Sequence, residues 1–262
     1  MRKEVILTTL GLRAGYGGKP VLQGLEIEVR ESEIVAVIGR NGVGKSTLMK
    51  SLIGLVPAMS GSIVYRGEAV EQLPAHKRAR LGMGYVPQGR DVFPRLTVGE
   101  SIAEGPVNYG TSHDKAMARA RELLELVGLP ADAISRYPHQ FSGGQRQRIA
   151  IARALALDPD VLVADEAVSA LDVSVQAQVL ELLDEIQRRL GIAILFITHD
   201  LRVAAQICDD VVVMQKGRIV EQGPAGEILT HPKEAYTRSL LEAAPGRHWD
   251  FANFRPVSEA VA

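Results

Sequence analysis

One stretch, residues 39–47, limits what this chain can fold into more than any other. It fits the pattern G-x-x-x-x-G-K-[ST] without a mismatch. The apolar run 33–38 before it predicts a buried strand, and residues 48–53 after it contain no Gly or Pro and predict a helix. A strand, a glycine-rich turn and a helix start present backbone N–H groups and the positive end of a helix dipole to an anion. The stretch comprises Gly39, Arg40, Asn41, Gly42, Val43, Gly44, Lys45, Ser46 and Thr47.

This phosphate loop predicts a site for a nucleoside triphosphate. Its glycines let the backbone approach phosphate oxygens closely. We expect Lys45 to reach the β- and γ-phosphates and the Ser46 hydroxyl to reach Mg²⁺. The loop alone does not indicate how the energy of the nucleotide is used.

Composition places the chain among ordinary globular proteins. Its 262 residues suit one large α/β domain or a core with an inserted subdomain, and its net charge of −1 gives no electrostatic case for a nucleic-acid partner. The single cysteine, Cys208, excludes an internal disulfide, and we expect a buried thiol in a cytoplasmic protein. The N-terminal apolar part is too short for a signal peptide, and no run of 18 apolar residues predicts a membrane span.

Acidic and histidine side chains follow two predicted buried strands. Asp165 and Glu166 come directly after the apolar run 161–164, and His199 follows the run 192–197. The carboxyl ends of parallel strands meet at one edge of a sheet, where open α/β folds bind ligands. We therefore expect Asp165 to hold Mg²⁺, Glu166 to polarise a water beside the γ-phosphate, and His199 to contact that phosphate.

A second anion site is predicted near the middle of the chain. Ser142 and Gln145 have the spacing of a capping box that opens a helix reaching about residue 156. Gly143 and Gly144 in its first turn cost about 1 kcal/mol each relative to Ala. Such a cost suggests that a ligand approaches the backbone at this helix start.

Several other segments give weaker predictions. Strands are expected at 4–10 and 21–29, joined by a glycine-rich segment in which Tyr16 either stacks on a nucleotide base or simply fills a turn. The basic cluster at 74–81 is expected to be a solvated helix face; it contains His76, Lys77, Arg78 and Arg80. Further helices are predicted at 114–127, 173–190 (with Asp172 as its cap and a Glu185–Arg189 pair) and 235–243, and a hairpin turn at Lys216-Gly217.

The segments suggest a division of the chain. Residues 1–88 and 159–230 contain the predicted strands, and residues from about 89 to 158 are mostly helical and form an inserted lobe. Residues 231–262 form a C-terminal appendage.

Taken together, these motifs resemble the ATP-binding subunits of ABC transporters. The family's motifs occur in its order: an aromatic residue (Tyr16), the Walker A loop (39–47), the Q-loop (Gln88), the signature (141–145), Walker B (161–165) with Glu166, the D-loop (169–172) and the switch histidine (His199). The Ser-Gly-Gly-Gln signature is the most specific of these. The resemblance implies an α/β fold: a P-loop NTPase (RecA-like) core with an antiparallel β subdomain and an inserted α-helical subdomain.

The resemblance also implies how the chain works. Two cassettes pair head to tail, as a homodimer or with a paralogue, so that Ser142, Gly143, Gly144 and Gln145 of one close over ATP bound to Walker A of the other, with Asp172 at the same composite site. Tyr16 stacks on adenine; Ser46, Gln88 and Asp165 serve Mg²⁺; Glu166 is the catalytic base; Lys45 and His199 stabilise the γ-phosphate. Integral-membrane permease subunits, and indirectly a solute-binding protein, are the implied partners at the cytoplasmic face of the cell membrane.

Two importer subfamilies are represented in the motifs. The N-terminal third, with Gly39-Arg40-Asn41-Gly42-Val43-Gly44 and the segment 84–98, resembles branched-chain amino acid (or urea) importers. The C-terminal two-thirds, including 136–141, 171–176 and the tail after His231, resembles dipeptide and oligopeptide importers. Peptide uptake is therefore the favoured function. A non-transport ABC ATPase is the alternative from another class, and Ala167 departs from the proline usual after the Walker B glutamate.

Overall fold

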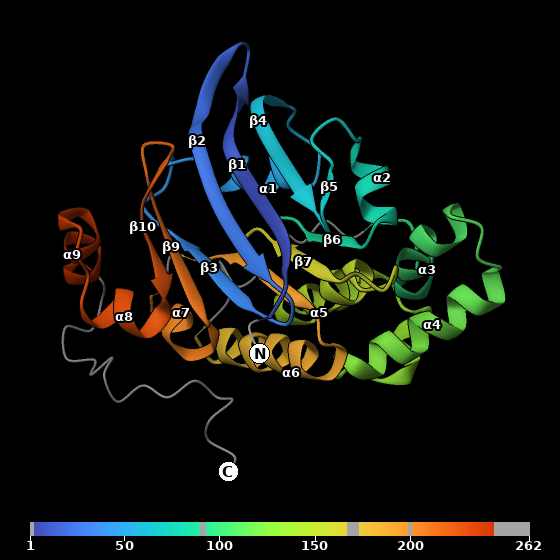
Figure 1. Cartoon of the computed structure of the whole chain (residues 1–262). Coiled ribbons are helices and arrows are strands. Elements are labelled where there is room, and N and C mark those ends of the chain that lie inside the picture. The colour runs from blue at the N-terminus through green and yellow to red at the C-terminus, as the bar shows by residue number, and fades with distance from the viewer. Residues whose placement is uncertain (1–2, 90–92, 167–172, 199–200, 244–262) are drawn as a thin grey trace.

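The computed structural model describes residues 3–89, 93–166, 173–198 and 201–243. Two β-sheets and their helices form layers: an antiparallel sheet above, a mixed sheet in the middle, and helices α5 and α6 below (Figure 1). No helix in these ranges is long and apolar enough to cross a membrane.

The central sheet has six strands in the order β10-β9-β3-β8-β7-β6. Five of them are parallel: β3 (Ile34–Ile38), β6 (Met83–Val86), β7 (Val161–Ala164), β8 (Ala193–Ile197) and β9 (Asp210–Gln215). β10 (Arg218–Pro224) pairs antiparallel with β9. Strands β3, β7 and β8 are buried at every position, because layers cover both faces of the sheet. Their carboxyl ends lie along one edge, as the sequence predicts.

The two faces of the central sheet contribute to separate cores. Along β3, Ile34, Ala36 and Ile38 pack with the helices, whereas Val35 and Val37 pack with the antiparallel sheet and with α1 (Lys45–Leu52). The alternation follows from the two-residue period of a strand. The phosphate loop therefore starts from a strand that is held from both sides.

The antiparallel sheet has the order β2-β1-β4-β5, with β1 (Val5–Tyr16), β2 (Lys19–Arg30), β4 (Ala58–Tyr65) and β5 (Glu68–Ala69). The expected joint at residues 11–20 was wrong, because both strands continue to a short turn at residues 17–18. Gly15 belongs to the strand, where a Cβ would lie 2.1 Å from the Lys19 carbonyl oxygen. Shifts of register between Thr9 and Gly15 mark β-bulges, which the glycines permit.

Helices fill the segment between the two halves of the central sheet. They are α3 (Val98–Asn108), α4 (His113–Leu126), two 3₁₀ turns (Ala131–Ser135 and Pro138–Gln140) and α5 (Gly143–Ala154). Thr97 and Glu100 form a capping box at the start of α3. Helix α4 buries one apolar stripe, Ala116, Ala120, Leu123 and Leu124, as its period predicts. Figure 1 shows α3 and α4 at one side of the molecule, and α5 below the central sheet.

The basic cluster on α2 (Ala75–Arg80) is solvated only in part. His76, Lys77 and Arg80 are exposed as expected, but Arg78 is 1% exposed, so the prediction was wrong for this residue. Its guanidinium donates four hydrogen bonds of 2.6–2.9 Å to the carbonyl oxygens of Ser51, Leu52, Leu73 and Glu71. The first two belong to the last turn of α1, where carbonyls lack partners within the helix. Arg78 thus caps the C-terminal end of the helix that follows the phosphate loop.

The remaining elements complete the central sheet and the C-terminal end of the chain. They are α6 (Val173–Leu190), α7 (Leu201–Ile207), α8 (Ala225–Thr230) and α9 (Ala235–Glu242). The Glu185–Arg189 pair is confirmed at 2.6 Å. Cys208 is buried, and burial raises the pKa of its thiol, which makes it unreactive as expected.

The predicted hairpin turn at Lys216-Gly217 is confirmed, and it also joins three parts of the molecule. The Gly217 N–H donates to the Val43 carbonyl of the phosphate loop at 2.8 Å, and the Gly217 carbonyl accepts from the Gln23 N–H of β2 at 2.8 Å. A Cβ at Gly217 would lie 1.9 Å from the Val21 carbonyl oxygen, so only glycine fits here.

Candidate nucleotide site

The phosphate loop runs from the carboxyl end of β3 into α1. Gly39 has φ = 145°, a conformation that other residues rarely adopt. A Cβ there would also lie 2.4 Å from the Met214 carbonyl oxygen. The loop is therefore pressed against β9, and its first position requires glycine for both reasons.

Lys45 folds back over its own loop. Its ammonium donates to the Gly39 carbonyl at 2.8 Å and to the Arg40 carbonyl at 3.0 Å. Burial lowers the pKa of Lys45, although the nearby carboxylates Glu166 and Asp165 oppose that shift. A phosphate would be a stronger acceptor for this buried cation than two neutral carbonyls. The geometry thus leaves Lys45 ready to exchange partners when an anion enters.

Ser46 and Asp165 meet across the sheet edge. The Ser46 hydroxyl donates to Asp165 Oδ1 at 3.0 Å, and Asp165 is completely buried. Asp165 Oδ2 has no hydrogen-bond partner among the described residues. Burial raises the pKa of Asp165, and the Ser46 hydrogen bond opposes that shift. A buried carboxylate oxygen without a partner, next to a hydroxyl, fits the oxygen ligands that Mg²⁺ prefers.

Glu166 and Gln88 also lie in contact. Gln88 Nε2 donates to Glu166 Oε2 at 2.7 Å. The backbone of Glu166 has φ = 52°, a left-handed conformation that is uncommon outside glycine and costs of order 1–3 kcal/mol. Such conformations gather at functional sites, where the fold holds a side chain in a required place.

A cavity of about 320 Å³ brings Lys45, Ser46, Gln88 and Glu166 together. Its described lining comprises Val21, Asn41, Gly42, Gly44, Lys45, Ser46, Thr47, Gln88 and Glu166. Val21, from β2, was not predicted, because a single apolar residue at a strand start carries no local signal. Ser142–Gln145 are absent from this lining, so the second predicted anion site lies apart from the first within one chain.

Comparison with known proteins places the chain in a family. The family model described as ABC transporter matches residues 22–169. The chain belongs to the ABC transporter family. A protein of Brucella ovis, provisionally named a peptide import ATP-binding protein, is 43% identical over 98% of this chain and 84% of its own length. The oligopeptide transport ATP-binding protein OppF of Lactococcus lactis is 43% identical over 86% of this chain and 72% of its own length.

Solved structures of ABC cassettes have the same fold. The chain superposes on cbiO1 from Clostridium perfringens, part of the ABC transporter complex cbiONQ, with a TM-score of 0.79 and 31% identity over 87% of this chain and 92% of that one. It superposes on the dimeric post-hydrolysis state of the ATP-binding cassette MJ0796, bound to ADP and Pi, with a TM-score of 0.75 and 25% identity over 84% and 99% of the two chains. The predicted P-loop NTPase fold class is confirmed, and the chain is an ATPase of this family.

The ABC signature segment forms the predicted capping box at the start of α5. The Gln145 N–H donates to Ser142 Oγ at 3.3 Å, and the Ser142 N–H donates to Gln145 Oε1 at 3.0 Å. Ser142 is exposed, which suits contact with a group outside the chain. Gly144 also has a reason inside the chain, because a Cβ there would lie 2.4 Å from Val175 Cγ1 on α6. Packing against α6 therefore explains the glycine at position 144 without a ligand.

Of the other predicted site residues, one lies in the described part of the chain and the rest lie outside it. Tyr16 ends β1 beside the turn and is 53% exposed, so its ring is accessible, but it does not line the loop cavity. Asp172, Ala167 and His199 lie outside the described residues.

Asp165→Asn is expected to abolish Mg²⁺-dependent ATP hydrolysis and yet to raise the melting temperature of the nucleotide-free protein. The folded-state pKa of Asp165 is raised, so its ionisation costs stability as the pH rises from the unfolded-state pKa, and the cost is complete above the folded-state pKa. Asparagine is neutral at every pH, so the gain is greatest near pH 7 and disappears as the pH falls below the carboxyl's unfolded-state pKa. Each kcal/mol recovered raises the melting temperature by roughly 2–4 °C in a chain of this size. A variant that melts below the wild type at pH 7 contradicts this account.

Proposed function

We propose that this chain powers solute uptake by an ABC transporter, and that the solute is a di- or oligopeptide. The observation that carries this proposal is the 43% identity to a relative named for peptide import, which extends over 98% of the chain. That identity includes the N-terminal third, whose motifs alone favoured a branched-chain amino acid or urea importer. It also includes the described appendage after residue 230.

The loop cavity supplies the groups that ATP hydrolysis needs. In our proposal Lys45 leaves the carbonyls of Gly39 and Arg40 and binds the β- and γ-phosphates. Glu166 accepts a proton from the attacking water. The water oxygen bonds to the γ-phosphorus while the bond between that phosphorus and the oxygen of ADP breaks. Gln88 donates to Glu166 Oε2, and its movement away would leave that oxygen more available to orient the water. His199, on the same sheet edge by sequence, holds the γ-phosphate.

Ser46, Asp165 and Gln88 would hold Mg²⁺. The metal, when bound, would neutralise charge on the β- and γ-phosphates. Ser46 and Asp165 already lie within hydrogen-bond distance, and Gln88 would supply its side-chain oxygen after leaving Glu166. One movement of Gln88 would thus complete the metal site and release the catalytic base.

The site is incomplete without a second cassette. Ser142–Gln145 are exposed or half-buried at a helix N-terminus, do not line their own chain's cavity, and could cover the phosphates of a partner's nucleotide. Tyr16 would stack on the adenine, and Asp172 would lie at the same interface. The dimeric state of the similar cassette MJ0796, bound to ADP and Pi, supports the pairing of two cassettes.

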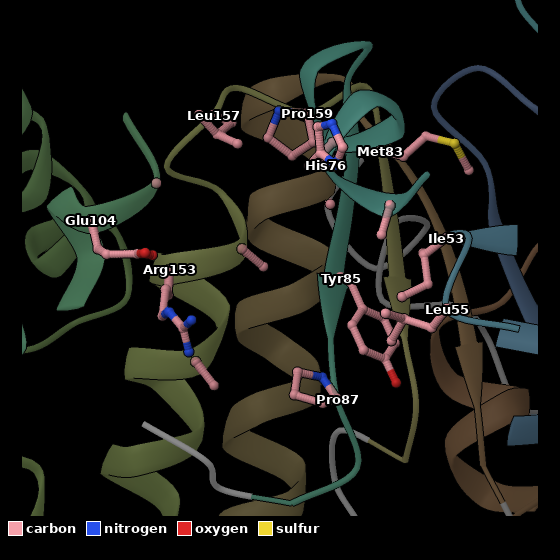
Figure 2. Close-up of a pocket in the computed structure, with 16 residues that line it drawn as sticks. Ile53, Leu55, His76, Met83, Tyr85, Pro87, Glu104, Arg153, Leu157 and Pro159 are labelled. Carbon is pink, nitrogen blue, oxygen red and sulfur yellow. The ribbon is translucent and has the colours of Figure 1, made fainter. Parts of the chain in front are cut away.

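A groove offers a docking place for the permease. It has a volume of about 360 Å³ and lies between β6 with α2 on one side and α3 with α5 on the other. Figure 2 shows apolar side chains such as Leu55 and Met83 on one side, and Glu104 pointing toward Arg153 on the other. Tyr85 and Pro87 line it and directly precede Gln88. A short helix of the permease seated here could sense the movement of Gln88, at the cytoplasmic face of the membrane.

Purification of the intact transporter tests the proposal. Tagged chain is isolated from its native membranes, the membrane subunits that accompany it are identified, and the complex is placed in liposomes with its binding protein. We expect ATP turnover to rise when the binding protein carries a peptide and not when branched-chain amino acids or urea are supplied. Stimulation by those solutes supports the second importer class, and the absence of any membrane subunit supports a non-transport ATPase.

A further inference from the structure

Helix α9, in the C-terminal appendage, touches the phosphate loop. The Arg40 N–H donates to the hydroxyl oxygen of Tyr236 at 3.1 Å, across 196 residues of sequence. We propose that Tyr236 is a positioning residue of the nucleotide site, whose hydroxyl holds the loop in the conformation that binds ATP. This inference rests on the proposed assignment of residues 39–47 as the ATP site.

Tyr236 is held on a fixed support. The Glu221 carboxylate on β10 accepts hydrogen bonds from the backbone N–H groups of Lys233 and Glu234, at 2.7 and 3.2 Å, just before α9 begins. Thr237 is completely buried, and Tyr236, Leu240 and Leu241 pack against the core that includes Ile38 of β3. The hydroxyl is therefore placed by contacts to the central sheet that also carries the loop. Figure 1 shows α8 and α9 beside β10.

The hydrogen bond to Tyr236 comes from Arg40, the residue whose carbonyl Lys45 must release when it binds phosphate. Lys45 donates to the Arg40 carbonyl at 3.0 Å, and Tyr236 accepts from the N–H of the same residue. When Lys45 turns to phosphate, the Arg40 carbonyl loses that donor, and the bond to Tyr236 remains to fix this part of the loop. Ordering a glycine-rich loop costs conformational entropy, and a contact that orders it beforehand lowers the cost of binding. Loss of the hydroxyl should therefore weaken ATP binding.

Tyr236→Phe tests this role, because it removes only the hydroxyl. We expect roughly two- to tenfold weaker ATP binding by the full-length chain, the range set by the net value of one hydrogen bond. Because the hydrogen bond is also present in the nucleotide-free chain, the variant should melt only a few degrees below the wild type and stay folded at the assay temperature. Affinity is measured by calorimetry with Mg²⁺ and a slowly hydrolysed ATP analogue, and melting by circular dichroism.

Tyr109→Phe is the matched control. Tyr109 is also half-buried, and its hydroxyl donates to the His76 carbonyl at 2.7 Å, in contact with α2 instead of the loop. Its loss should leave ATP affinity unchanged. Wild-type or tighter binding by Tyr236→Phe overturns the proposal, and so does a loss of affinity that only follows a loss of folded protein. Lys45→Ala tests the underlying assignment separately: if it too binds ATP normally, the loop is not the ATP site.

Discussion

Glu166→Gln is expected to reduce ATP turnover by at least about 100-fold while ATP still binds. Removing a general base typically costs 10²- to 10⁴-fold, because the attacking water then keeps its proton as it approaches the phosphorus. Glutamine has the same size and can still accept the hydrogen bond from Gln88, so the cavity keeps its shape. With turnover blocked, ATP-bound dimers should accumulate. Phosphate release measures the first effect, and size-exclusion chromatography with ATP measures the second.

The matched control is Glu185→Gln on α6. It removes an exposed carboxylate that pairs with Arg189 at 2.6 Å and does not line the cavity. Exposed pairs of this kind contribute little, so turnover and stability should stay near those of the wild type. If Glu166→Gln hydrolyses ATP at the wild-type rate, another group must accept the proton and the base assignment is wrong.

Ser142→Arg is expected to abolish hydrolysis and to leave ATP binding to the isolated chain intact. Ser142 is exposed and caps α5, and it does not line the cavity of its own chain. A long cation at this position would block the approach of a partner's nucleotide. Loss of the cap should cost about 1 kcal/mol of stability, which leaves the chain folded. ATP affinity and phosphate release are measured on the same preparation.

Ser112→Arg provides the comparison for this substitution. Ser112 is also an exposed serine at the start of a helix, α4, where its side chain makes no capping hydrogen bond. Ser112→Arg should hydrolyse ATP at close to the wild-type rate. If Ser142→Arg instead prevents ATP binding to the single chain, the signature contributes to its own chain's site, and the composite arrangement is wrong.

The parts of the site that could be predicted are those encoded locally. Residues 39–47 combine a strand end, a turn and a helix start in one short stretch, and Asp165 and Glu166 directly follow a buried strand. The rule that parallel strands share an edge was then enough to bring Ser46 and Asp165 together. The contact between Ser46 and Asp165 thus follows from that rule alone.

The parts that could not be predicted depend on contacts between distant segments. Arg78 looks like one charge among several on a short helix, and only the fold shows four carbonyls around its guanidinium. The hydrogen bond between Arg40 and Tyr236 joins residues that are 196 positions apart, and no local sequence pattern predicts it. In β1, glycines that usually mark turns instead permit bulges within a strand, so the predicted end of that strand came too early.

The turn at Gly217 bears on where the protein can be labelled. Hairpin tips are normally the places that tolerate inserted tags and reporters. Lys216 at this tip is exposed, but Gly217 is buried and its backbone joins the phosphate loop to β2, so an insertion would separate the nucleotide site from the antiparallel sheet. The turn at Arg66-Gly67, between β4 and β5, has open space where a Cβ of Gly67 would lie. A fluorophore or affinity tag therefore belongs at Gly67, even though both tips look alike in the sequence.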